Sequence, residues 1–506
     1  MNHDQSSAVP SRNSSFSFRR LVRLIRGRKS ERDSYTRGPI AGTMLRTALV
    51  MLPGTLTISG YNLVDAYFVG QLEGDAPMAA IGLTAPLVMI CGCFFHGLSA
   101  GVMTTTAQSL GGKRRWRAEQ LVSTGLFLIT LVSLSFAIIG PLVTRAVYRN
   151  VMHASPEATR LATSYMDIWF WACVTSALGM SGNNLLVTAN DSKMASATMV
   201  LGLASNALLD PVFMFQTHIG SIPVGFGLGV VGAAWATVMA QIIGTTPVLA
   251  ILWRKHHLIR FRAVKIAKLA SLWKRIISFA IPACLGSLML PIGQFIMTWI
   301  TSHFGDVVIG AITAAQRVQV IAFFFPMSLG VSLMPMIGQN YGARLYSRIN
   351  GCRRFAMRFA FFYLMSMSVL FCFFAPEIAG KFLADDKVEM RAVMAFALRI
   401  LPWGFAFLEA HRYSGFFFTG CGRPMAAAML NAMRILGFLV PLSLLVLLYF
   451  RLMGNEDTAL TLLLVSQMAA DVFAGTIAII LARRLTRRFP ADGESESFGR
   501  HRRMFD

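Results

Sequence analysis

The stretch GLFLITLVSLSFAIIGPLV, residues 125–143, runs for 19 residues without a charged side chain. An apolar segment of ~20 residues matches the hydrocarbon core of a bilayer, where a helix satisfies its own backbone hydrogen bonds. Similar blocks recur, such as ILGFLVPLSLLVLLYF at 435–450. The chain of 506 residues is 55% hydrophobic and only 14% charged, whereas soluble proteins carry about a quarter charged residues. We therefore predict an all-α integral membrane protein.

Twelve apolar segments follow one another along the chain. They cover residues 42–71, 77–108, 118–147, 158–186, 192–216, 228–253, 272–302, 307–338, 350–375, 389–418, 425–450 and 458–484. Each is long enough for one transmembrane helix. Because the number of segments is even, the two ends of the chain are expected on the same side of the membrane.

The basic residues gather in the tails and in alternate loops rather than within the apolar blocks. The loops after the second, sixth and eighth segments are basic, whereas the loops after odd segments are poorer in base or acidic. The loop after the third segment, with Arg145 and Arg149, fits this alternation least well. The positive-inside rule then places both termini in the cytoplasm of a plasma (bacterial inner) membrane. The same distribution explains the net charge of +23 without any nucleic-acid partner.

The chain is expected to have five parts. They are a basic N-terminal tail at 1–38, a first lobe at 39–253, a basic linker at 254–271, a second lobe at 272–485 and a C-terminal tail at 486–506. No cleavable signal peptide is expected in the first tail. Its basic amphipathic stretch at 16–26 either lies on an anionic inner leaflet or belongs to a tail that fixes topology. The seven cysteines show no metal-binding spacing and are interpreted as packing residues in a reduced setting.

The two halves of the chain repeat each other. A shift of 231 positions aligns short matches without gaps: Gly74-Asp75 with Gly305-Asp306, Met103 with Met334, Gln108 with Gln339, Gly111 with Gly342, and Met194-Ala195 with Met425-Ala426. Each repeat holds six spans, so both insert the same way up. We expect two six-helix bundles related by a pseudo-twofold axis along the membrane normal, with a cleft between them.

Two acids lie within the apolar spans of the first half. Tyr61 and Asn62 precede Asp65 by about one helical turn, and Asn206 precedes Asp210 by four residues, so each acid has a neutral partner on its own face. An ionisable side chain inside a span costs several kcal/mol, ~3 on insertion scales, and is a functional candidate. The shift of 231 places Ile296 opposite Asp65 and Pro441 opposite Asp210, so the acids do not repeat. We therefore assign ion coupling to the first lobe; the alternative is that each acid sits solvated at a helix end.

Other polar side chains within the spans carry weaker signals. Glu409 either contacts a cationic substrate or pairs with Arg412 or Arg399, and Arg317 is either a pair partner or a substrate ligand. Met103 is a further candidate for the substrate cleft, because soft side chains suit varied amphiphiles, and Tyr61 and Asn62 are also candidates for the cleft. A packing role is expected for the remaining polar residues within spans: Asp167, Asp471, His96 and His411.

No phosphate-binding loop, nucleophile elbow or HExxH pair is present in the sequence. This favours a secondary transporter over an ATP-driven pump or a membrane enzyme. No cofactor is expected beyond the coupling ion.

Several of these motifs together resemble the multidrug and toxic compound extrusion (MATE) family over residues 40–485. They are Asn62-Leu63-Val64-Asp65 with Phe68-Val69-Gly70, Asn206 through Pro211, Gly232-Ala233-Ala234-Trp235-Ala236-Thr237 with Gln241, and Asn340-Tyr341-Gly342-Ala343. The chain lacks an acid in the stretch 286–291, where another branch has a glutamate, and so is closer to the DinF-like branch.

The resemblance implies a V-shaped pair of bundles that exchange drug-like, often cationic molecules for H⁺ or Na⁺. It implies an ion-coupling set of Asp65, Asn206 and Asp210, completed by Tyr165 and Thr237, with Na⁺ as the alternative to a proton at the first three. We therefore expect an efflux antiporter that carries a small-molecule substrate and acts as a monomer in the bilayer. A flippase for a lipid-linked sugar or cell-wall precursor is the alternative, and a membrane enzyme or scaffold is a third.

Overall fold

The computed structural model describes residues 35–73, 76–150, 156–216, 218–219, 222–223, 225–260, 266–383 and 387–494. Most of the predicted N-terminal tail, including the amphipathic stretch at 16–26, lies outside these residues. So do part of the linker at 261–265 and the end of the C-terminal tail at 495–506.

Six long helices form the first lobe. They are α2 (Ile40–Val69), α3 (Ala76–Gly111), α4 (Arg115–Asn150), α5 (Pro156–Thr188), α6 (Ser192–Met214) and α7 (Val230–Arg254). Between α6 and α7 the chain forms a small antiparallel hairpin of β1 (His218–Ile219) and β2 (Ile222–Pro223).

The second lobe also crosses the membrane six times, with three of its spans interrupted or extended by shorter turns. Its elements are α8 (Ile266–Thr301) with η1 (Ser302–Phe304), α9 (Asp306–Gly342), α10 (Tyr346–Phe373), α11 (Ala375–Phe382), α12 (Val388–Ile400) continued by η2 (Leu401–Gly404) and α13 (Phe405–Gly420), α14 (Pro424–Ala432) continued by the π-helical turn η3 (Met433–Leu439) and α15 (Val440–Met453), and α16 (Glu456–Thr486). The short helix α11 lies between two spans.

Within the described residues, eleven helical segments are long and apolar enough to cross a bilayer. The twelfth span is α5, which has 33 residues but carries more polar side chains, among them Glu157 and Asp167. The predicted fold class is therefore confirmed: the protein is an all-α, multi-pass membrane protein with twelve transmembrane helices.

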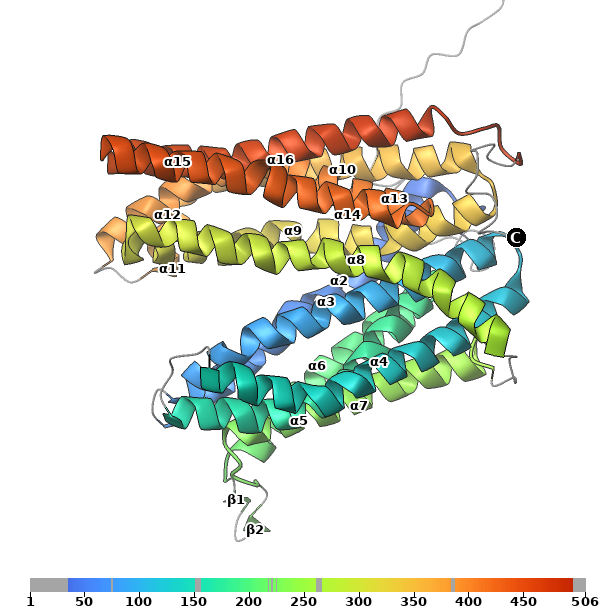
Figure 1. Ribbon diagram of the computed structural model, residues 1–506, viewed down its shortest axis with the longest axis horizontal. Coiled ribbons are helices and arrows are strands. Elements are labelled where there is room, and N and C mark those ends of the chain that lie inside the picture. The colour runs from blue at the N-terminus through green and yellow to red at the C-terminus, as the bar shows by residue number, and fades with distance from the viewer. Residues whose placement is uncertain are drawn as a thin grey trace, which may run out of the picture.

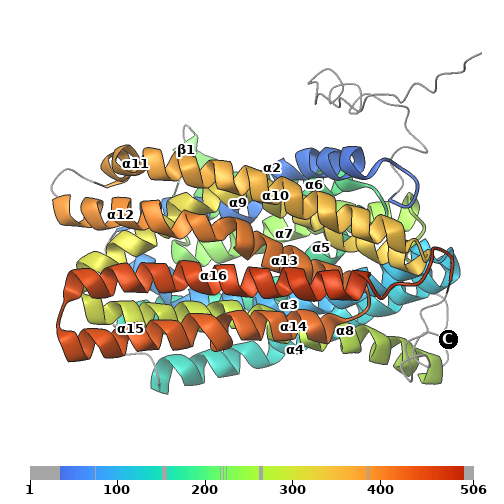
Figure 2. The same ribbon diagram turned by 90° about the horizontal axis from the view of Figure 1, so that it is seen from above.

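The two lobes form a V (Figure 1). They meet at the end where α3 and α9 finish, and they separate toward the end that carries the hairpin, α11 and α12. Figure 2 shows that the helices of both lobes run in nearly the same direction. Each lobe has its own apolar core: one cluster centred on Leu121 and Met166 fills the first lobe, and clusters that include Leu463 and Tyr413 fill the second.

The turns at the meeting end repeat between the lobes. Lys113 and Arg344, 231 positions apart, adopt left-handed φ values of 58° and 59°. Each turn closes with the same backbone bond, from Arg114 N to Ser109 O at 2.9 Å and from Leu345 N to Asn340 O at 2.8 Å. A left-handed residue followed by such a bond is a common helix C-terminus. The internal repeat expected from the sequence is thus present in backbone detail.

Reciprocal contacts join the lobes at this end. Gln108 Nε2 donates to Gly420 O of the second lobe at 3.1 Å, and Gln339 Nε2 donates to Thr188 O of the first at 2.7 Å. Gly111 packs against the backbone of Gln339, as its repeat partner Gly342 packs against that of Gln108. A side chain on either glycine would collide with a carbonyl of the other lobe. We call these contacts of residues 108, 111, 339 and 342 the junction.

The linker after α7 folds back onto the first lobe. Asp191 accepts hydrogen bonds from Lys255 Nζ at 2.5 Å and from the His256 ring at 2.9 Å. The contact with His256, helped by Lys255, lowers the pKa of Asp191 to about 2 despite its partial burial. Arg115 Nη2 also donates to the His256 carbonyl at 2.7 Å. The start of the basic linker, at Lys255 and His256, is therefore fixed at the junction end of the molecule.

The junction yields a first prediction. Gly111→Ala should destabilise the closed junction by about 1–3 kcal/mol, because the new methyl group overlaps the Gln339 carbonyl, where neither backbone can move freely. The measurement is the Tm of purified protein in detergent. Gly92→Ala, in the same helix but with no atom within 4 Å of the added carbon, is the matched control. Equal Tm values for the two variants would contradict the close packing of the junction.

Candidate functional site

Asp65 lies on α2 in the half of the molecule where the lobes separate. The lobes touch at Thr55, whose hydroxyl lies 2.5 Å from that of Ser328 on α9. Asp65 follows Thr55 by ten residues of helix, which places it about 15 Å further toward the open end. One carboxylate oxygen of Asp65, Oδ1, is buried and has no hydrogen-bond partner. The backbone of Asn62 belongs to the same helix, but its side chain lies outside the described part of the chain.

The close approach of α2 and α6 sets the position of Asp65. Gly54 and Gly60 on α2 leave room for Ser196 and Leu203 on α6. Gly202 on α6 in turn leaves room for the Tyr61 hydroxyl. Tyr61 therefore packs against α6 and supports the helix pair one turn before Asp65.

The α6 pair of Asn206 and Asp210 is fully buried, with 0% of either residue exposed. Because the two residues are one turn apart, Asn206 Nδ2 donates to Asp210 Oδ1 at 3.2 Å. The remaining oxygens, Asn206 Oδ1 and Asp210 Oδ2, have no partner. Asp65 lies close enough to interact with both side chains. The alternative that Asp210 is a solvated acid at a helix end is therefore excluded.

Two further helices complete this cluster. Tyr165 of α5 is 5% exposed, lies beside Thr237 of α7, and is within electrostatic range of Asp65 and Asp210. Thr237 Oγ1 is buried without a partner. The fold thus brings together all five residues expected to couple an ion, from four helices of the first lobe. We call Asp65, Tyr165, Asn206, Asp210 and Thr237 the acidic cluster.

The acidic cluster holds two carboxylates, and no basic side chain pairs with either of them in the described part of the chain. Four of its oxygens lack a hydrogen-bond partner: Asp65 Oδ1, Asn206 Oδ1, Asp210 Oδ2 and Thr237 Oγ1. Leaving a buried acceptor unsatisfied costs about 1–3 kcal/mol, and more when it is charged. A shared proton would convert one acceptor into a donor, and a small hard cation would take several oxygens as ligands. The donor set fits both.

The other cleft candidates are spread over the second lobe and the junction. Met103 is 4% exposed and packs with its repeat partner Met334 between the lobes, so it lies beneath the cleft and not on an open surface. Glu409 is fully buried and pairs with Arg412 at 3.1 Å, which agrees with the predicted ion pair. Arg317 is exposed on α9, and the described residues offer it no hydrogen bond or ion pair.

A second polar network, which the sequence did not indicate, links α13, α14, η3 and α16. His411 contacts Asn431 Oδ1 at 2.9 Å, and Asn431 Nδ2 donates to Gly286 O at 3.2 Å. Arg434, in the π-helical turn, pairs with Asp471 at 2.8 Å. The residues are 20 to 145 positions apart in these pairs, so no spacing pattern announces them. Unlike the acidic cluster, this network balances its charges.

The chain is similar to known proteins over most of its length. The MatE family model matches residues 52–212 and 282–445, which together are more than half of the chain. The FAD transporter of Shewanella oneidensis is 25% identical over 455 residues, which are 90% of this chain and 97% of that protein. The multidrug export protein MepA of Staphylococcus aureus is 22% identical over 394 residues, covering 76% of this chain and 82% of that protein.

Solved structures share the fold. An outward-facing multidrug resistance MATE family transporter of the MOP superfamily has a TM-score of 0.81 at 22% identity, covering 93% of this chain and all of its own. A MOP superfamily transporter from Pyrococcus furiosus, described as having a binding pocket of reverse polarity, has a TM-score of 0.80 at 21% identity, covering 92% of this chain and 99% of its own.

The unpaired carboxylates yield a second prediction. Asp210→Asn should raise the Tm at neutral pH, because an amide of the same shape removes one of two neighbouring buried charges and supplies a donor. Thermal unfolding of the purified protein measures the effect, and Asp457→Asn, at an exposed end of α16, is the control. A lower Tm for Asp210→Asn alone would show that the carboxylate has a stabilising partner.

Proposed function

Because the chain belongs to the MatE family of membrane transporters, we propose that it is a secondary active exporter of amphiphilic small molecules, driven by H⁺ or Na⁺. As a member of this family it is a transporter and not an enzyme. The coupling role of the acidic cluster rests chiefly on one observation: its four unpartnered buried oxygens lie together beside two carboxylates.

The proposed coupling follows from the electrostatics of that cluster. When a proton or cation is bound, the charge of the carboxylates is offset and α2 and α6 pack closely. When the ion leaves, repulsion between Asp65 and Asp210 and the cost of their burial favour an arrangement in which water reaches them. An ion that binds one arrangement more tightly shifts the population toward it. Alternation between the two arrangements would move substrate through the cleft.

We propose that the junction end faces the cytoplasm. The basic turns at Lys113 and Arg344 and the basic residues Arg254 and Lys255 lie at that end, as the positive-inside rule requires. The structure is then open to the outside, and its likeness to an outward-facing transporter supports this orientation. Both ends of the chain would lie inside the cell, in the bacterial inner membrane.

Two classes of molecule fit the proposed exporter as substrates. Drug-like cations are the first, supported by the multidrug export relatives and by the carboxylates of the acidic cluster. An anionic dinucleotide such as FAD is the second, supported by the similarity to the FAD transporter and by Arg317, an exposed cation that has no partner among the described residues. Arg317 lies in the open half of α9, about 17 Å from the contact at Ser328. A charged residue within a span is expected to face a water-filled cleft.

The decisive variant is Asp65→Asn. It should abolish gradient-driven efflux from proteoliposomes, because the amide cannot bind and release a proton at neutral pH, while expression is retained and the Tm does not fall below that of the wild type. The proteoliposomes are loaded with either ethidium or FAD, and a proton gradient or a sodium gradient is imposed in separate experiments. Efflux under each combination identifies both the substrate and the coupling ion.

Asp457→Asn is the control and should transport as the wild type does. Efflux retained by Asp65→Asn at the wild-type rate would exclude the acidic cluster as the coupling site. If the wild type exports FAD but not ethidium, and Arg317→Gln reduces FAD efflux, the substrate is the dinucleotide and not the cation.

A further inference from the structure

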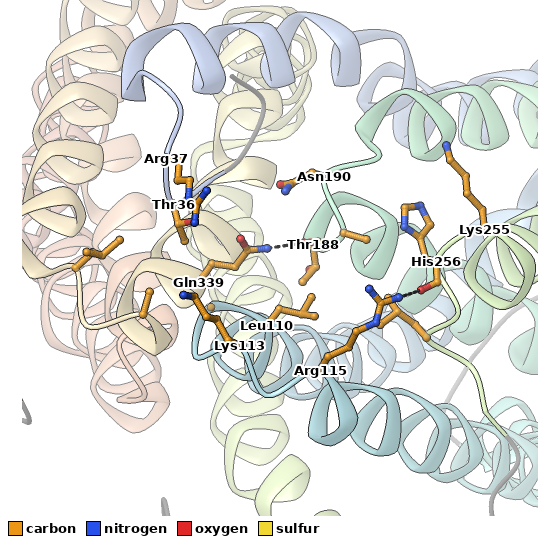
Figure 3. A pocket seen from close by; sticks show the side chains of 15 residues that line it. Thr36, Arg37, Leu110, Lys113, Arg115, Thr188, Asn190, Lys255, His256 and Gln339 are labelled. Atoms are coloured by element: carbon orange, nitrogen blue, oxygen red, sulfur yellow. Dashed lines mark hydrogen bonds between the residues drawn. The ribbon is translucent and has the colours of Figure 1, made fainter. Parts of the chain in front are cut away.

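A pocket of about 620 Å³ opens at the junction end, outside the cleft and away from the acidic cluster (Figure 3). Its size is that of a small-molecule site, for which about 300–1,000 Å³ is usual. Both lobes contribute to its wall: the turn after α3, the start of α4 and the end of α5 from the first, and the end of α9 from the second. The segment before α2 closes one side with Thr36 and Arg37.

The wall of the pocket is basic. Arg37, Lys113, Arg115 and Lys255 line it together with His256, and none of its fifteen lining residues is acidic. Figure 3 shows these side chains around the same space, with Asn190 and Gln339 between them. Lys113 forms no ion pair within the described ranges. Four fixed positive charges around one concave space favour an anion with several negative charges.

The acids behind the wall hold these cations in place without neutralising the pocket. Glu119 lies 3.4 Å from Arg115 Nε, and Asp191 lies 2.5 Å from Lys255 Nζ. The low pKa of Asp191, about 2, keeps that carboxylate ionised at any physiological pH. Arg115 and Lys255 remain 62% and 57% exposed at their side chains, so they retain donors for a ligand. Glu119 and Asp191 thus hold Arg115 and Lys255 at the wall, and neither acid is itself a lining residue.

The pocket exists only where the lobes touch. Its floor contains the Gln339–Thr188 hydrogen bond of 2.7 Å, drawn as a dashed line in Figure 3, and the Gly111 contact with Gln339. Moving α9 away from α3 and α5 would separate one wall from the other three. A ligand that contacts both lobes therefore binds the closed junction more tightly and stabilises it.

We propose that this pocket is a binding site for a phosphate-bearing anion, which closes the junction by bridging Lys113 and Arg115 of the first lobe to the end of α9. The ligand is distinct from the transported substrate, which uses the cleft. Two sources supply this chemistry, a soluble polyphosphate or nucleotide and the headgroup of an anionic lipid.

Calorimetry on the full-length protein in neutral detergent, with sodium pyrophosphate as the probe, tests the soluble source. Nanodiscs of phosphatidylglycerol and of phosphatidylcholine, compared by Tm, test the lipid source. The double variant K113Q/R115Q should weaken binding roughly tenfold or more. Arg354→Gln, an exposed base on α10 outside the pocket, is the matched control and should bind as the wild type does.

Hydrogen exchange supplies a readout that does not depend on transport. Pyrophosphate or phosphatidylglycerol should slow exchange at 110–116, 188–191 and 339–345 together in the wild type, and at none of them in K113Q/R115Q. Binding of either probe with this pattern supports the proposal and identifies the source. The proposal would be overturned if neither pyrophosphate nor phosphatidylglycerol binds, if all variants bind equally well, or if only one lobe is protected from exchange.

These outcomes are independent of the proposed export activity. Asp65→Asn, which is expected to lose transport, should keep pyrophosphate binding and the same protection. If Asp65→Asn retains efflux while K113Q/R115Q loses binding, the coupling proposal fails and the pocket stands. The reverse result would remove the pocket and leave the transporter assignment intact.

Discussion

Two carboxylates, on Asp65 and Asp210, lie close together in the first lobe, and the described residues provide no cation to balance them. Such a pair is costly to bury, so the surrounding helices must hold it there. They do so through close packing: glycines at 54, 60 and 202 let α2 and α6 approach until the acids interact. Small residues at helix contacts are the usual means of close approach in a membrane, where apolar burial alone gives little drive.

The second lobe shows the opposite solution to the same problem. Both acids in the interior of its spans are paired with an arginine, Asp471 with Arg434 and Glu409 with Arg412. A balanced pair is stable in one arrangement and gains little from binding a proton. The two lobes therefore share a scaffold but differ in electrostatics, and the proposed ion response rests on the unpaired acids of the first.

The junction lies at the other end of the molecule from the acidic cluster. Gln108 and Gln339 each donate a hydrogen bond to a backbone carbonyl of the opposite lobe, and Gly111 and Gly342 each pack on the backbone of that lobe. The same interface continues along α3 and α8, where Gly97 and Gly101 lie against the backbone carbonyls of Ala280 and Ile276. The basic pocket lies over the junction, so an anion there would oppose separation of the lobes.

The sequence by itself determined the class of the protein, its spans and its repeat. Long apolar blocks leave the backbone no alternative to helices in lipid, and a constant shift of 231 positions makes two similar bundles. It also singled out Asp65, Asn206 and Asp210, because an acid within an apolar span stands out and its helical neighbours follow from spacing.

Only the tertiary structure decided what those residues meet. Tyr165 and Thr237 come from other helices, and no local pattern links them to the acids; the family resemblance alone suggested them. The pairing of Arg434 with Asp471, the burial of Met103 and the basic pocket were equally invisible in the sequence. Each depends on how helices far apart in the chain pack, and packing distances are not encoded in the spacing of residues along one helix.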